Sequence, residues 1–185
     1  SPPPELSEQL LVNLGIVTRT DDRRFTPTVG GYLIFSKEDP IEHREFFRYC
    51  VRCIRYSGND PSSPIVDKAD VTGTLDKQIE EAKKFILRNI ALKASISGTK
   101  RVEVYAYPEG AIREIVANAI IHRDYQTTET YTQIVVFADR IEVSNPGTLP
   151  PGINIDNLKT AQYSRNEIIA QILRDMDYME EYGRG

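Results

Sequence analysis

Apolar residues recur at intervals of three and four along several segments of the chain, which is the spacing of one face of an α-helix. This spacing predicts helices over residues 5–14, 75–90, 109–123 and 167–176. Gly15, directly after the first segment, is a common helix stop, and Pro108 fits the first turn of the third helix because its missing N–H would be unpaired there anyway. The Ser164-x-x-Glu167 pattern before the fourth segment is a capping box, which predicts a helix start at that point.

Runs rich in β-branched and aromatic residues predict the strands. They cover residues 46–56, 102–107, 130–137 and 140–144. Ala138-Asp139 joins the last two runs, so we expect a tight antiparallel hairpin that ends at Asn145-Pro146-Gly147. The apolar run 28–35 is too short to be assigned to a helix or to a strand.

Loop-forming residues between positions 57 and 64 interrupt this pattern, and we expect two subregions to meet there. The prediction is a smaller N-terminal α/β segment over residues 1–70 and an α+β domain over residues 71–185. A chain of 185 residues suits one domain or two small ones, so the length is compatible with this division.

The charge balance argues against DNA binding by this stretch of chain. Lys and Arg total 23 against 27 Asp and Glu, a net charge of −4, and no run of like charges forms a basic stripe. No apolar stretch approaches the roughly 20 residues that span a bilayer, and no secretory leader is present, so we expect a cytoplasmic protein. Ser1 replaces a start methionine, and Gly183-Arg184-Gly185 ends inside a predicted loop, so we expect a piece of a longer protein.

Cys50 and Cys53 form a C-x-x-C pattern, a spacing also found in zinc and redox sites. They lie in the predicted strand 46–56, where their odd separation would place them on opposite faces. A second cysteine pair is lacking, and neither His43 nor His122 stands at ligand spacing to the first. We therefore interpret both cysteines as structural.

The predicted helix 109–123 carries the most informative polar residues. Glu114, Asn118 and His122 are four residues apart, which places them in a ridge along the edge of the apolar stripe. A carboxamide oxygen suits Mg²⁺ held chiefly by phosphate and water, and a carboxylate one turn away could orient or deprotonate an attacking water. This spacing indicates a nucleoside triphosphate site, and the alternative is a solvated helix face with no ligand.

Short motifs in the second half of the chain form a recognisable set. They are Tyr107-Pro108, Arg113-Glu114-x-x-x-Asn118-Ala119, His122-Arg123-Asp124-Tyr125, Arg140-Ile141-Glu142-Val143-x-Asn145-Pro146-Gly147, Leu149-Pro150, Ser164-Arg165-Asn166 and Glu181-x-Gly183-x-Gly185. Together they resemble the C-terminal region of predicted bacterial transcriptional regulators that begin with a Schlafen-type AlbA domain, some of which are labelled helicase-related. Leu10-Leu11-x-x-Leu14-Gly15 and Pro27-Thr28-x-x-Gly31 resemble the tail of that AlbA domain, so residues 1–70 would be the tail.

The resemblance implies a divergent member of the superfamily of gyrase, heat-shock chaperone, histidine kinase and mismatch-repair ATPases (GHKL). Its members bind ATP with Mg²⁺ in a two-layer α/β sandwich. In that family pattern Glu114 matches the general base and Asn118 the Mg²⁺-binding amide. Asn145 and Gly147 fall where the superfamily has the Asp and Gly of its D-x-G-x-G box, whose Asp accepts from the adenine amino group.

The same resemblance implies further nucleotide-binding residues near the C-terminus. Gly183 and Gly185 resemble the later glycine pair, which lets backbone N–H groups approach phosphates. Arg165 and Asn166 belong to the matching motif, and Arg165 could reach a phosphate as a bidentate donor. Pairing of Arg165 with Glu167 or with the acidic run 175–181 is the alternative.

These expectations lead to two hypotheses about function. The first is an ATP-binding regulatory module of a bacterial transcriptional regulator, at most a weak and slow ATPase. The second is a nucleotide-independent dimerisation or effector-sensing platform of the same regulator, which the departures Asn145 and Pro146 favour. The chain has no Gly-x-x-x-x-Gly-Lys-Ser/Thr loop, so a helicase motor is not expected. The expected partner is a nucleotide, and DNA would be contacted only by regions outside this chain. No membrane contact is expected, and a homo-oligomer is possible.

Overall fold

The computed structural model describes residues 7–90, 92–97, 100–149, 152–154, 156–157 and 164–178, and only the backbone for the strands between 92 and 105. In chain order the helices are α1 (Glu8–Asn13), α2 (Val29–Phe35), the 3-10 helix η1 (Pro40–Glu42), α3 (Leu75–Asn89), α4 (Glu109–His122) and α5 (Glu167–Asp175). The strands are β1 (Val17–Arg19), β2 (Phe25–Pro27), β3 (Val51–Tyr56), β4 (Ile65–Val71), β5 (Leu92–Ser97), β6 (Lys100–Tyr105), β7 (Thr132–Val136) and β8 (Ile141–Ser144). This mixture confirms the predicted α+β class.

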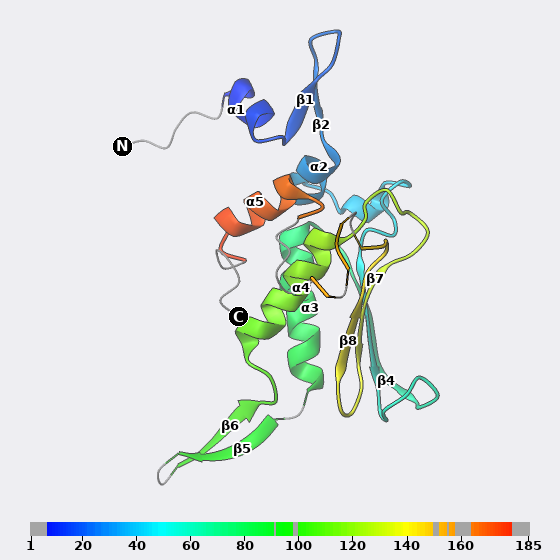
Figure 1. Cartoon of the computed structure of the whole chain (residues 1–185), viewed down its shortest axis with the longest axis vertical. Coiled ribbons are helices and arrows are strands. Elements are labelled where there is room, and N and C mark those ends of the chain that lie inside the picture. The colour runs from blue at the N-terminus through cyan, green and yellow to red at the C-terminus, as the bar shows by residue number, and fades with distance from the viewer. Residues whose placement is uncertain are drawn as a thin grey trace.

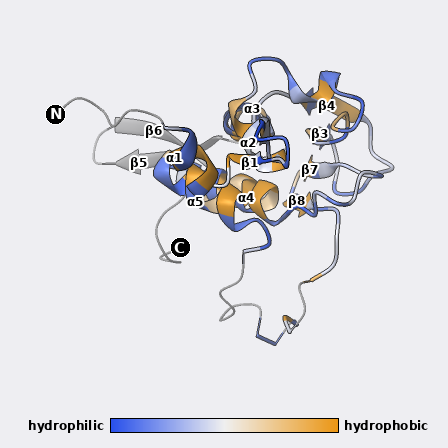
Figure 2. Cartoon of the chain, turned by 90° about the horizontal axis from the view of Figure 1, so that it is seen from above, coloured by the Kyte–Doolittle hydropathy of each residue, from blue (hydrophilic) through white to orange (hydrophobic). Residues whose placement is uncertain are grey.

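A sheet with the order β4-β3-β7-β8 forms one layer of the molecule. β3 pairs with β4 and β7 with β8 in antiparallel fashion, whereas β3 and β7 run parallel in the centre, with Val51 opposite Thr132. A parallel pair needs a long crossover, and α3, the β5–β6 hairpin and α4 provide it. Figure 2 shows α3 and α4 together on one side of this sheet, so the predicted two-layer sandwich is confirmed.

The core lies between these helices and the sheet. On α3 the buried positions recur at helical spacing, as the sequence predicts. The fully buried side chains of the two layers include Leu75, Ile79, Phe85, Ile86, Val116, Ile120, Val51 and Ile134. Leu33 and Ile34 of α2 join the same cluster, so the N-terminal segment shares this core.

The predicted division at residue 70 falls at the end of β4. Strands β3 and β4 on its N-terminal side lie in one sheet with β7 and β8 on its C-terminal side. The β1–β2 hairpin projects from one end of the molecule and the β5–β6 hairpin from the other (Figure 1). The two-domain division stays a prediction, and the sheet and core extend across it.

Several local assignments differ from the sequence prediction. Residues 29–35 form a helix, with Thr28 as the N-cap that accepts from Gly31 N–H. The strand predicted from residue 46 begins only at Val51, because residues 43–49 form turns closed by Tyr49 N–H to the Phe46 carbonyl, at 2.8 Å. The sequence prediction also missed the strands β1, β2, β4 and β5, of which β5 pairs with β6 in a separate hairpin.

Both cysteines are buried and free. Cys50 precedes β3 and Cys53 lies within it. Burial raises the pKa of the Cys50 thiol to about 11 and that of the Cys53 thiol to about 12, so both stay protonated at neutral pH. Within the described residues no group of His, Cys, Asp and Glu side chains is arranged to hold a metal ion, and no helix has the length and apolarity to cross a bilayer.

Candidate functional site

Helix α4 packs against α3 and the sheet through a broad apolar face. Ile112, Val116 and Ile120 are buried, as the predicted stripe requires. Ile115, which helical spacing also assigns to this stripe, is 44% exposed. Ala117 and Ile121 are buried instead, because α3 and α5 pack along the other flank of α4 and shift the buried arc away from Ile115.

Glu114 and Asn118 lie one turn apart on α4, and both side chains are half-buried. In the part of the chain that the structure describes, neither side chain takes part in a hydrogen bond or an ion pair. His122 continues the ridge at the end of the helix and is exposed. The buried part of its ring, and then the nearby Arg165 cation, lower the pKa of His122, so its imidazole is neutral at neutral pH.

The Asn-Pro-Gly turn after β8 is attached to α4 at the level of Asn118. Asn145 Nδ2 donates to the carbonyl of Ala119 at 2.6 Å, and Asn145 Oδ1 accepts from Thr132 Oγ1 at 2.9 Å. These two bonds fix the orientation of the amide, since a carbonyl can only accept. Asn145 keeps one N–H and one lone pair for other partners.

The cavity beside this turn does not include the polar ridge of α4. It has a volume of about 220 Å³, and Asn145, Pro146, Arg52 and Tyr131 are among its lining residues. Glu114 and Asn118 do not line it. The structure therefore places the turn next to the helix that carries the ridge, but the cavity beside the turn is lined without Glu114 and Asn118.

The backbone at Gly147 lies so close to Asp124 and Arg165 that only glycine fits there. Its φ of +108° is a left-handed conformation, and a Cβ at this position would lie 2.7 Å from Asp124 Cβ and 3.3 Å from Arg165 Nη1. The turn therefore packs directly on the ion pair between Asp124 and Arg165.

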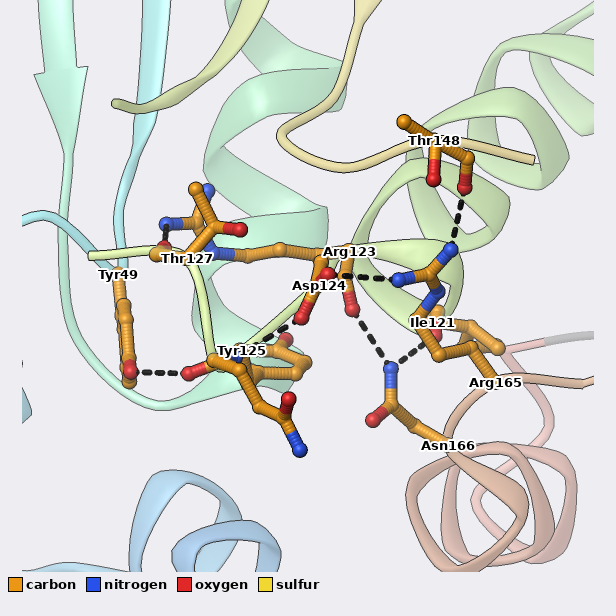
Figure 3. Close-up of polar contacts among 10 residues, drawn as sticks. Tyr49, Ile121, Arg123, Asp124, Tyr125, Thr127, Thr148, Arg165 and Asn166 are labelled. Atoms are coloured by element: carbon orange, nitrogen blue, oxygen red, sulfur yellow. Dashed lines mark hydrogen bonds and ion pairs between the residues drawn. The ribbon is translucent and has the colours of Figure 1, made fainter. Parts of the chain in front are cut away.

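Arg165 and Asn166 attach the start of α5 to the end of α4 (Figure 3). Arg165 Nη1 lies 2.7 Å from Asp124 Oδ2, and Arg165 Nη2 donates to the Thr148 carbonyl, so Arg165 pairs with Asp124 rather than with Glu167. Asn166, not Ser164 of the predicted capping box, is the N-cap of α5, and its side chain makes no cap bond. It donates instead to two carbonyls at the end of α4, those of Ile121 at 2.6 Å and Arg123 at 2.8 Å.

The residue that sequence reasoning missed is Arg123, whose guanidinium is buried behind this end of α4. Only 2% of Arg123 is exposed, and desolvation lowers its pKa. It donates to the carbonyls of Thr130 at 2.9 Å and Thr127 at 3.3 Å, and it lies 5.1 Å from the centre of the Tyr49 ring. Within the described residues it has no carboxylate partner. Tyr125, two residues after Arg123, was the one sign in the sequence that an aromatic ring could pack on this arginine. Tyr49 comes close to Arg123 only in the folded chain.

The candidate residues thus fall into two groups with respect to Mg²⁺ and ATP. Glu114 and Asn118 fit such a ligand, because they offer free oxygen atoms of the hard type that Mg²⁺ prefers. Asn145, Arg165 and Asn166 already use part of their hydrogen-bonding capacity inside the fold. Gly183 and Gly185 lie outside the described residues.

The orientation of Asn145 leads to a first prediction. We expect Asn145→Asp to lower the free energy of unfolding by about 2 kcal/mol, because a carboxylate cannot donate to the Ala119 carbonyl and sets a charge against it. Urea unfolding would measure the change. Asn59→Asp is the control, since Asn59 is exposed in a loop. Equal stability of the two variants would contradict the assigned orientation.

Comparison with known proteins matches part of the chain to a family and nearly all of it to the fold of solved structures. Residues 129–185 match the family model described as "Putative ATP-dependent DNA helicase recG C-terminal". The DIP2311 protein from Corynebacterium diphtheriae has a similar fold, with a TM-score of 0.72 and 19% sequence identity over 95% of this chain and 34% of that chain. No curated protein matches.

These matches extend over different parts of the chain. The similar fold covers nearly all of it, and the chain spans about a third of the length of the DIP2311 protein. The family match begins after α4 and includes β7, the Asn-Pro-Gly turn and α5, so Glu114 and Asn118 precede it. The family match supports an ATPase-like domain in the C-terminal part of the chain.

Proposed function

We propose that this chain is an ATP-binding module that regulates a larger bacterial transcriptional regulator, with slow hydrolysis at most. The observation that carries the proposal is the pair Glu114 and Asn118, half-buried on α4 and without a hydrogen-bond partner among the described residues. Polar groups that are half-buried and unpaired lose part of their hydrogen bonding to water, and a bound ligand can replace it. The ATPase-type family match to the adjoining residues 129–185 supports ATP as the ligand.

The two residues have different roles in this proposal. A bound Mg²⁺ would neutralise phosphate charge. Asn118 would offer its amide oxygen to the metal, and Glu114 would accept a proton from a water molecule one turn away. Because α4 is anchored by Val116 and Ile120 in the core, both side chains are held on a rigid element.

A second candidate function rests on the other residues of the motif set. Asn145, Arg165 and Asn166 all bond to the main chain or to side chains of this fold. This favours a platform for dimerisation or effector sensing in which the shared motifs have structural roles. The two candidates differ in whether Asn118 affects nucleotide binding.

The test is titration of a fluorescent ATP analogue against the chain, with and without Mg²⁺. We expect saturable Mg²⁺-dependent binding by the wild type, and Asn118→Ala to raise the dissociation constant by about tenfold or more, which corresponds to about 1.4 kcal/mol. Glu114→Gln should retain binding and lose phosphate release. Asn59→Ala and Glu109→Gln are matched controls at exposed positions. Equal weak signals from the wild type and Asn118→Ala would reject ATP binding at this site. The dimerisation or effector-sensing platform would then be the remaining candidate function.

A further inference from the structure

A second cavity lies at the far end of the molecule from the Asn-Pro-Gly turn. It is located where the end of α3, the start of α4 and the β7–β8 turn meet, and its volume is about 320 Å³. The two places are at opposite ends of β8, since Ile141 lines the cavity and Asn145 follows the last residue of the strand. The volume is that of a small ligand site.

The lining combines an apolar wall with a polar rim. Ile90, Val136 and Ile141 line the cavity, and all three belong to the hydrophobic core or pack against it. Arg55 and Tyr107 contribute polar groups, and Tyr107 is 39% exposed. Such a surface suits a ligand with an apolar body and one polar end.

Arg55 has no acidic partner among the described residues, although an aspartate lies directly opposite. Asp67 is its neighbour on β4, but the Asp67 carboxylate accepts from Arg88 at 2.9 Å and from Asn89 at 2.7 Å. In the part of the chain that the structure describes, Arg55 donates only to the carbonyl of Val136, at 3.2 Å, and it is half-buried. The guanidinium therefore keeps donors available for an anion.

The other arginine of the cavity is already neutralised. Arg140 pairs with Asp139 at 3.0 Å and with Glu142 at 2.6 Å. Asp139 also lines the cavity, but Arg140 holds its carboxylate, so among the described residues Arg55 is the cation of the lining without an acidic partner. One such cation beside an apolar wall matches a single carboxylate group rather than a polyphosphate. The cavity therefore differs from the proposed nucleotide site in its lining, which does not include Glu114 or Asn118, and in the charge of the ligand that it suits.

We propose that this cavity binds a small monocarboxylate with an apolar ring or short chain, whose carboxylate accepts from Arg55. The guanidinium fork matches a carboxylate in a bidentate arrangement, and the wall formed by Ile90, Val136 and Ile141 covers the apolar body. Benzoate is a suitable probe because it combines one carboxylate with a ring, and benzamide has the same shape without the charge.

The experiment is isothermal titration calorimetry of benzoate and benzamide against the chain. We expect benzoate to bind more tightly than benzamide, and Arg55→Gln to weaken benzoate binding by about tenfold or more while benzamide changes little. Arg19→Gln is the matched control, since Arg19 is an exposed arginine on β1. Ala106→Leu, which adds volume at the cavity wall, should weaken both probes.

The outcomes that overturn the proposal are distinct. Arg55 also lies near the C-terminal end of α3, where a cation is favourable for the helix. If Arg55→Gln changes the unfolding midpoint but leaves the benzoate affinity of the folded protein unchanged, the side chain serves only the fold. Equal binding of benzoate and benzamide, or no binding of either to the wild type, rejects the site. Circular dichroism of each variant verifies that the loss is not due to unfolding.

Discussion

Alanine at position 31 is expected to lower the free energy of unfolding by about 3 kcal/mol or more, which is at the upper end for overpacking of a core position. Gly31 is buried in α2, and a Cβ at this position would lie 2.0 Å from the carbonyl oxygen of Ile16 and 2.8 Å from its carbon. Backbone atoms cannot rotate away as a side chain can. The helix and the turn before β1 would have to separate, which also breaks the bond from Thr28 N–H to the Ile16 carbonyl.

A second glycine in a helix gives the matched control. Gly110 lies exposed in the first turn of α4, and a Cβ there has no neighbour within 4 Å. Gly110→Ala should therefore stabilise the protein by about 0.5–1 kcal/mol through the lower entropy of the unfolded chain. Urea unfolding of both variants measures the difference. Equal effects of the two substitutions would mean that α2 is not in contact with Ile16.

This contact matters because it fixes the N-terminal segment to the rest of the chain. Next to Gly31, Gly30 approaches Ile169 of α5, where an added Cβ would lie 3.2 Å away. Gly15 approaches Ile168 of the same helix. Helix α5 thus packs on the N-terminal segment through its apolar residues, while Arg165 and Asn166 before it bond to the end of α4.

The sequence predicted those parts of the fold that depend on local spacing. Helices α3 and α4 carry long stripes of apolar residues, and the two runs of β7 and β8 flank a two-residue link, so pattern alone was sufficient. The parallel pairing of β3 with β7 joins residues about eighty positions apart and leaves no local signal. The aromatic residues around Phe46 misled the strand prediction because they pack against one another, with Phe46 and Tyr49 ring centres 5.3 Å apart.

The candidate site was predictable to a similar extent. The spacing of Glu114 and Asn118 was sufficient to place both on one flank of α4, where the structure has them half-buried. The bonds of Asn145 to Ala119 and of Asn166 to Ile121 were not predictable, because each joins elements that meet only in the folded chain. A motif therefore identified residues that lie near one another without revealing which of them stabilise the fold.

Arg123 is the clearest example of such a residue. Its guanidinium lies beside the Tyr49 and Tyr125 rings, at 5.1 and 5.8 Å from their centres, and the two rings contact each other edge to face. It holds the loop between α4 and β7 through the carbonyls of Thr127 and Thr130. Tyr125 reinforces the same loop by donating to the Ile120 carbonyl at 3.1 Å. A buried cation without an acid is tolerated here because carbonyl oxygens and aromatic faces both present negative potential to it.

We therefore expect Arg123→Ala to lower the free energy of unfolding by about 3 kcal/mol, because two carbonyls lose their donor and a void opens beside the two rings. Arg123→Lys should cost about half as much, since it keeps the cation but not the planar fork. Chemical unfolding measures both, and hydrogen exchange of residues 124–131 should accelerate in the alanine variant. If the alanine variant instead stays within about 1 kcal/mol of wild type, Tyr125 and the Asp124–Arg165 pair hold the loop without the buried cation.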